Sequence, residues 1–246
     1  MPNIYLSPST QQANLYVTGG SEEYWMNLLA DELEPWLTAS GIRFTRNTPQ
    51  MTAGSSIRAS NAGNYDFHLA LHSNAAPEGR YGEVQGIIAF YAPNSIKGKQ
   101  AAVLISENLS TIYPYSEGAR AQSTTSLGEV TRTRAPAVLV EIAYHDNVDD
   151  ANWITSNLEQ IAEKLALSMT EYFGLPLVPP MMPQTGKVAL SSENLNIRSY
   201  PSTGGRVIAS APNNSVLTVL GNKNGWYTVN YNGTVGFASA DYIQLT

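Results

Sequence analysis

The stretch HLALHSN, His68 to Asn74, holds two of the three histidines of this 246-residue chain. Alternation along a strand places His68, Ala70 and His72 on one face. The two histidines would lie about 13 Å apart at about 3.3 Å per residue, whereas ligands of one zinc ion lie about 2 Å from the metal. One strand therefore offers a metal only one histidine. His72 is the better candidate, because sites in open α/β sheets form at the carboxyl ends of strands. The alternative for both histidines is a structural, hydrogen-bonded role, which we favour for His68.

A second apolar stretch, APAVLVEIAY at residues 135–144, contains a single carboxylate, Glu141, and His145 follows it. A carboxylate inside a buried strand must be paired, protonated or bound to metal. Low polarity also raises its pKa, which suits a general base or acid. We therefore interpret Glu141 as functional. The alternative is an internal salt bridge to Arg132 or Arg134.

Strands and helices alternate over residues 1–174. The pattern predicts strands at 3–6, 42–46, 67–73, 86–93 and 135–144. It predicts helices at 21–40, where Ser21 is the N-cap and Gly41 the stop, at 95–112 and at 149–173. This order predicts an α/β fold with a mostly parallel sheet covered by helices on both faces.

The remainder of the chain has a different character. Residues 175–186, LPLVPPMMPQTG, contain four prolines and are predicted to form an extended, semi-rigid linker. Residues 187–246 hold short β-rich runs separated by Asn-Asn, Gly-Gly and two Asn-Gly pairs. Such dense turn chemistry predicts a small all-β barrel.

Composition narrows the classes of function. The net charge is −6, which gives no electrostatic basis for binding nucleic acid. The chain has no cysteine, so disulfides and thiolate metal sites are excluded. No apolar run approaches the roughly 20 residues of a transmembrane helix, and the opening MPNIYLSPST shows no secretory signal. Nothing in the sequence indicates an oligomeric state.

Two acidic residues, Glu22 and Glu23, follow Ser21 at the start of the first predicted helix. Acids in a first turn commonly complement the helix dipole. Taken together, however, one histidine, one such carboxylate and the buried Glu141 are the parts of a zinc-water hydrolase.

These residues resemble the zinc-dependent N-acetylmuramoyl-L-alanine amidases of the Amidase_3 type, over residues 3–174. LALHSNA resembles the family's S-x-H-x-N-A motif, which implies zinc binding by His72. PAVLVEIAYHDN resembles P-A-V-L-V-E-x-x-F-x-x-N, which implies catalysis by Glu141. The first helix matches the family's register when Glu22 is the ligand, with Glu23 as the alternative if the register shifts by one.

One departure from the family concerns the third zinc ligand. The family's first strand ends in D-P-G-H-G-G, whereas this chain reads LSPSTQQAN, with Thr10 where the histidine is expected. The third ligand is therefore uncertain. His145 is a candidate replacement, or a group that stabilises charge on the scissile carbonyl oxygen; the alternative is a histidine in a surface loop without a role in the site.

The C-terminal part resembles bacterial SH3 domains through LNIRSYPSTGGRVI and NGWYTVNYNGTVGF. Such modules often bind cell-wall peptides and tether hydrolases to their substrate. Trp226 and Tyr227, with Tyr200, are candidates for a binding surface; the alternative is that Trp226 and Tyr227 fill the core of the barrel.

The resemblance implies a peptidoglycan hydrolase that acts at the bacterial cell wall or outside the cell, and that cleaves the amide between N-acetylmuramic acid and L-alanine with zinc-activated water. Asn74, Arg132 and Arg134 are candidate substrate-binding residues. The alternatives are a protein that has lost its metal and only binds peptidoglycan, and a zinc peptidase acting on the stem peptide. The sequence does not distinguish an autolysin from an endolysin.

Overall fold

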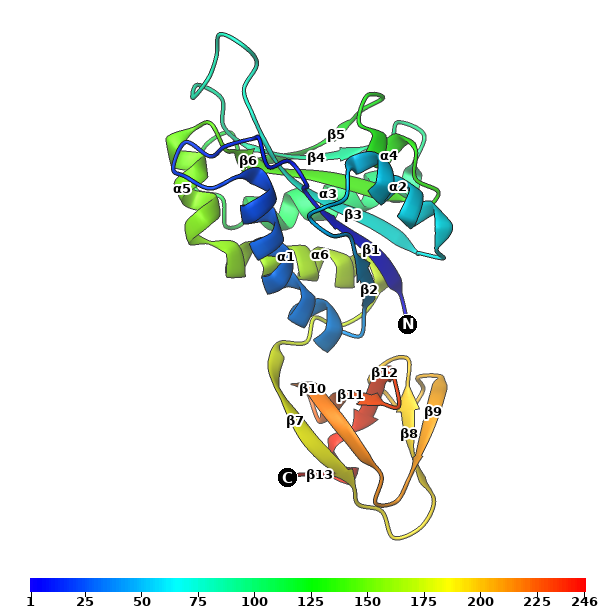
Figure 1. Ribbon diagram of the computed structural model, residues 1–246. Coiled ribbons are helices and arrows are strands. Elements are labelled where there is room, and N and C mark those ends of the chain that lie inside the picture. The colour runs from blue at the N-terminus through cyan, green and yellow to red at the C-terminus, as the bar shows by residue number, and fades with distance from the viewer. The chain divides into compact units, whose positions relative to one another are not determined.

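The computed structural model describes residues 1–246, which divide into two compact units (Figure 1). The α/β unit comprises residues 3–34 and 44–172, and the β unit comprises residues 1–2, 35–43 and 173–246. The last turns of the first helix therefore belong to the β unit. The domain boundaries at residues 174 and 187 stay a prediction.

The α/β unit is built on a six-stranded sheet in the order β2-β1-β3-β6-β4-β5. Three of its strand pairs are parallel, namely β1–β3, β3–β6 and β4–β5. The pair β4–β6 is antiparallel. Residues on both faces of β3 and β6 are buried, so both faces are covered, as predicted. The strands are β1 (Asn3–Pro8), β2 (Arg43–Arg46), β3 (Phe67–Asn74), β4 (Ile87–Tyr91), β5 (Ala119–Ser123) and β6 (Ala137–Tyr144).

Six helices accompany this sheet: α1 (Glu22–Ala39), α2 (Ala53–Ala62), α3 (Ile96–Ser110), α4 (Gly128–Thr131), α5 (Val148–Ser156) and α6 (Leu158–Phe173). The predicted N-cap of α1 is confirmed, because the Ser21 hydroxyl accepts a hydrogen bond from the Tyr24 backbone N–H. The predicted helix at 149–173 is in fact two helices. Asn157 ends the first of them, and its side-chain amide donates to the Trp153 carbonyl, a local bond that competes with helix continuation.

Two helices and one strand were not predicted from the sequence. The α2 sequence AGSSIRASNA has no apolar periodicity, and its start is set by a capping box between Thr52 and Ser55. Helix α4 is only four residues long, and it lies beside α2 in Figure 1. Strand β5 pairs with β4 at the edge of the sheet. Helix α4 proves important for the site.

The β unit contains a seven-stranded antiparallel sheet in the order β13-β7-β10-β11-β12-β8-β9. Asn224-Gly225 and Asn232-Gly233 all have positive φ and form the predicted two-residue hairpin turns. Its strands are β7 (Pro180–Val188), β8 (Asn194–Arg198), β9 (Val207–Pro212), β10 (Val216–Lys223), β11 (Trp226–Tyr231), β12 (Thr234–Ser239) and β13 (Ile243–Leu245), with the 3₁₀ turn η1 (Ala240–Tyr242) before the last.

The predicted linker at 175–186 differs from the structure over its second half. Residues from Pro180 onward belong to β7, which pairs with β10 and β13. Proline lacks a backbone N–H donor but adopts the extended conformation. It therefore fits a strand that has no hydrogen-bonded neighbouring strand on one side. The pairing with β13 involves Gly186 to Val188 only, which leaves the proline-containing part of β7 unpaired on that side.

No helix of the structure has the length and apolar character needed to cross a membrane.

Candidate functional site

Three neighbouring parallel strands bring the sequence-predicted residues to one face of the sheet. In the register between β3 and β6, His72 lies directly opposite Glu141, and Ala70 lies opposite Leu139. In the register between β1 and β3, Ser7 lies opposite Ala70. Because side chains alternate between faces, Ser7, His72 and Glu141 share a face near the carboxyl ends of their strands.

The start of α1 carries Glu22 to His72. The loop between β1 and α1 folds back on itself, and there the Glu22 backbone N–H donates a hydrogen bond to the Asn14 carbonyl. The Glu22 carboxylate is buried, with Oε1 2.7 Å from His72 Nδ1 and Oε2 accepting from the Asn14 amide at 2.6 Å. Burial raises the pKa of Glu22, but the bonds and charge of His72, with other hydrogen bonds, outweigh it and lower that pKa. Glu23 makes no side-chain contact with His72.

Glu129 on α4 is a member of this site that sequence reasoning missed. Its carboxylate is buried, and Oε2 accepts from His72 Nε2 at 3.0 Å. Its Oε1 accepts from the Ser7 hydroxyl at 2.5 Å and lies 3.3 Å from His68 Nε2. Burial raises the pKa of Glu129, but the two histidines outweigh it and lower the pKa to about 2. The carboxylate therefore stays ionised.

The His72 ring is consequently held between two carboxylates, Glu22 on Nδ1 and Glu129 on Nε2. Burial alone lowers the pKa of His72, but the hydrogen bonds and negative charge of Glu129 and Glu22 raise it well above its usual value. Without a bound cation, the imidazole is positively charged.

Glu141 has a different environment from the other two carboxylates. Its Oε2 is buried and has no hydrogen-bond partner, and no salt bridge joins it to Arg132 or Arg134. Burial raises its pKa to about 7; the negative charges of Glu22 and Glu129 add to this effect, and His72 opposes it. A carboxyl group that titrates near neutral pH is suited to accept and return a proton.

A β-bulge separates His145 from this cluster. His72 pairs with Glu141, but Asn74 pairs with Tyr144, so β6 has one extra residue, and Ala143 has φ 55°. The His145 Nδ1 lies 3.0 Å from the hydroxyl oxygen of Ser73, which is on the face opposite His72. The structure therefore does not bring His145 to Glu22 and His72.

The residues around Nδ1 of His72 form only part of a metal site. No group of three or more histidine, cysteine, aspartate or glutamate side chains is arranged to hold one. His72 Nδ1 and Glu22 Oε1 nevertheless converge. The Gln11 Nε2 atom lies 3.4 Å from the first and 3.5 Å from the second, while Gln11 Oε1 accepts from the Asn14 amide at 3.1 Å. Thr10 makes no such contact. An imidazole nitrogen and a carboxylate are ligand types that a divalent cation such as zinc takes, and the Gln11 amide would add an oxygen ligand if its oxygen and nitrogen exchanged places.

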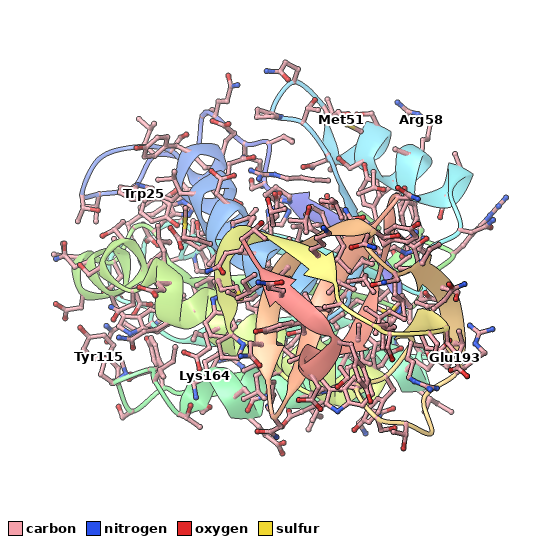
Figure 2. The ribbon with its side chains drawn as sticks, turned by 90° about the horizontal axis from the view of Figure 1, so that it is seen from below. Trp25, Met51, Arg58, Tyr115, Lys164 and Glu193 are labelled. Carbon is pink, nitrogen blue, oxygen red and sulfur yellow. The ribbon has the colours of Figure 1, made fainter.

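His72 and Gln11 face a cavity of about 420 Å³. Glu129 and Glu141 also line it, as does Met51, which Figure 2 labels in the loop before α2. Glu141 Oε2, which has no hydrogen-bond partner, and the charged imidazole of His72 therefore line a cavity that is large enough for part of a peptide substrate.

The predicted substrate-binding residues lie outside that cavity lining. Arg132 and Arg134 are exposed and follow α4, where their backbone groups bond to Asn61. Asn74 is half-buried, and its side-chain oxygen accepts from the Ala75 backbone N–H.

Trp226 and Tyr227 are both half-buried in the β unit. Tyr227 packs against the core of the antiparallel sheet, and Trp226 packs near Phe237 and Val178. Trp226 also lines a second cavity of about 590 Å³, together with Glu193, Arg198 and other residues.

Comparisons with known proteins agree with this description. Residues 10–171 match the sequence profile of the N-acetylmuramoyl-L-alanine amidase family, and residues 193–244 match that of the bacterial SH3 domain. No curated protein sequence matches the chain significantly.

Solved structures of amidases share the fold at low sequence identity. The amidase AmiC2 of Nostoc punctiforme is 14% identical, with a TM-score of 0.62 over 70% of this chain and 97% of that one. The amidase of Clostridium difficile 630 is 15% identical, with a TM-score of 0.61 over 70% and 97%. The catalytic domain of CwlV from Bacillus (Paenibacillus) polymyxa is 14% identical, with a TM-score of 0.62 over 72% and 100%. With the family profile matched over most of its length, the chain belongs to the N-acetylmuramoyl-L-alanine amidase family and carries a C-terminal bacterial SH3 domain.

Proposed function

We propose that this chain hydrolyses the amide bond between the lactyl group of N-acetylmuramic acid and L-alanine in peptidoglycan, at the bacterial cell wall. The observation that carries the proposal is the pairing of His72 with Glu141 across β3 and β6, with Glu22 against the same histidine. Family membership supplies the substrate class, and the site supplies the groups that amide hydrolysis requires.

The proposed cofactor is Zn²⁺, held by His72 Nδ1 and Glu22, with the Gln11 amide as the third group that faces both. When bound, such an ion polarises the scissile carbonyl and lowers the pKa of a coordinated water towards about 7. With its amide turned so that Oε1 faces the cation, Gln11 would supply a weaker oxygen ligand in place of a nitrogen ligand. We therefore expect weaker zinc affinity than a site with two histidines would have.

Glu141 is the proposed catalytic base and acid. Its carboxylate accepts a proton from the attacking water and delivers it to the departing amine of L-alanine, so one residue both takes up and returns the proton. Its orphan oxygen is free to make that bond, because no other protein group occupies it. A pKa of about 7 allows both the ionised and the protonated form near neutral pH.

The SH3 domain is the proposed tether to the wall. Its cavity, which Trp226 lines, offers a place for a peptide, and tethering raises the local concentration of substrate without new chemistry. Asn74, Arg132 and Arg134 remain proposed contacts of the glycan or stem peptide.

The test is digestion of purified peptidoglycan, with product masses read by mass spectrometry. The wild-type protein with zinc is expected to release intact stem peptides with a free L-alanine amine. Glu141→Gln is expected to lose at least about 100-fold of the rate, as for other general bases. Glu78→Gln, at an exposed loop position, serves as the matched control and is expected to keep full activity.

Glu22→Gln and Glu23→Gln distinguish the two helix registers, since only the first should lose activity and zinc. Cuts within the stem peptide would replace the amidase by the peptidase alternative. Binding of peptidoglycan without any product, even with added zinc, would mean that the chain only binds the wall.

A further inference from the structure

Glu129 holds the second nitrogen of the proposed zinc histidine, and neither the family motifs nor the mechanism above assigns it a role. Glu129 Oε2 lies 3.0 Å from His72 Nε2, and because a carboxylate oxygen accepts hydrogen bonds, this contact places a proton on that nitrogen. In the metal-free imidazolium, Nδ1 carries the second proton and faces Glu22, 2.7 Å away, so Nδ1 is the nitrogen that would give up its proton to bind a cation beside Glu22.

Glu129 is itself held firmly by its neighbours. Ser7 donates to its Oε1, and the Ser7 hydroxyl in turn accepts from the Asn47 amide at 3.2 Å. His68 also contacts Oε1, and the other ring nitrogen of His68 lies 3.0 Å from the Ser60 hydroxyl. All of these side chains are buried, so the carboxylate has little freedom to turn away from His72.

This arrangement has a cost that calls for an explanation. Burying a charged carboxylate is unfavourable unless it is fully bonded, and a buried ion pair is often no more stable than apolar residues of the same volume. Helix α4 otherwise packs through apolar residues, since Val130 and Leu127 meet Ala70 and Leu139. An apolar residue at position 129 would continue that packing but would leave His72 Nε2 unpaired.

We propose that Glu129 is the positioning residue of the metal site: it accepts the Nε2–H of His72 and so fixes the tautomer and orientation in which Nδ1 faces the cation beside Glu22. The inference rests on the proposed function, because it assumes a cation at Nδ1. Carboxylates behind metal-binding histidines act in this way in general, and their loss typically weakens metal binding by about 10–100-fold. His68 and Ser7 extend the support outward from Glu129.

The test measures zinc affinity by competition with a chromophoric chelator, on full-length Glu129→Gln, Glu129→Asp and Glu23→Gln. Glu129→Gln keeps the shape of the side chain, and we expect its zinc affinity to fall about 10–100-fold. Glu129→Asp restores a carboxylate and should recover part of that loss. Glu23→Gln should bind zinc as the wild type does.

A spectroscopic readout separates positioning from a merely structural role. In ¹⁵N-labelled zinc-bound protein, long-range ¹H–¹⁵N spectra should show His72 protonated at Nε2 and ligated at Nδ1. Glu129→Gln should show a mixture of tautomers or an altered Nε2–H signal, while circular dichroism reports an intact fold. An unchanged spectrum with zinc affinity within about twofold of wild type would overturn the proposal.

Peptidoglycan digestion, assayed in parallel, separates this proposal from the proposed function. A wild-type protein that binds zinc and depends on Glu129 for it, but releases no products, refutes the amidase activity and leaves the role of Glu129 standing. A wild-type protein that digests peptidoglycan without binding zinc refutes the role of Glu129 and leaves the amidase activity standing.

Discussion

Replacing Glu141 by glutamine tests the electrostatics of the site through the stability of the fold. The substitution keeps the size of the side chain and removes its charge. Burial raises the Glu141 pKa from 4.5 to about 7, and each pKa unit corresponds to about 1.4 kcal/mol. Ionised Glu141 therefore lowers the free energy of unfolding by about 3.5 kcal/mol relative to the same group in the unfolded chain.

The sign of the pH dependence follows from the raised pKa. A carboxyl group with a raised folded-state pKa gives its full stabilisation below its unfolded pKa of 4.5, and this is lost as the pH rises through about 7. The unfolded chain is already mostly ionised at about pH 5, so part of the loss has occurred there. From about pH 5 to 8.5, we expect the wild type to lose about 2.5 kcal/mol relative to Glu141→Gln.

The assay is urea unfolding of both proteins across that pH range, with a chelator present so that no divalent cation shifts the equilibrium. The comparison removes the titrations that both proteins share and leaves that of Glu141 together with its electrostatic coupling to Glu22, His72 and Glu129. Glu78→Gln is the control, and its difference from wild type should not vary with pH. A wild-type minus Glu141→Gln difference that stays flat, or that grows more favourable with rising pH, would refute the electrostatic reasoning.

Three further substitutions test the fold around the site and in the β unit. Asp150→Ala removes the acceptor of two backbone N–H groups, that of Tyr144 among them, and should lower the free energy of unfolding by about 3 kcal/mol; a loss below about 1 kcal/mol would contradict this. Ala143→Gly relieves a positive φ of 55° and should leave thermal stability unchanged or raise it by up to about 1 kcal/mol, so a clear loss in calorimetry would argue against backbone strain there. Gly186→Ala would place a Cβ 2.7 Å from Ile243 and should destabilise the β unit by about 1–3 kcal/mol in thermal unfolding, whereas a neutral effect would show that the strand yields easily.

Much of the fold could be predicted because its signals are local. The strands β3 and β6 are apolar runs bounded by turns, α1 and α3 have serine N-caps, and the Asn-Gly pairs form the expected hairpins. Helix α2 could not be predicted from periodicity, because only its capping box and its neighbours hold it in place.

The candidate site was predictable to the extent that a single residue breaks its local pattern. Glu141 interrupts an apolar strand, and His72 ends one at the carboxyl edge, so each is visible without knowledge of the fold. Glu129 interrupts nothing, since it lies in the polar stretch STTSLGEVTRTR. One signal for it did exist: His68 and His72 share a buried face, and two buried imidazoles there require an acceptor that β3 itself does not provide.

His145 shows how one extra residue changes which side chains meet. In a regular strand, residues 141, 143 and 145 share a face, so His145 would lie on the same side as Glu141 and His72. The bulge at Ile142 and Ala143 shifts that alternation by one, because Asn74 pairs with Tyr144. His145 therefore reaches the opposite face, where it contacts Ser73 and stacks on Tyr16 at 5.4 Å. A bulge of this kind depends on an alanine with positive φ, which its residue type does not announce. The neighbours of His72 Nδ1 are therefore Glu22 and Gln11 rather than His145, so the metal ligands proposed for this chain depend on backbone geometry as much as on residue type.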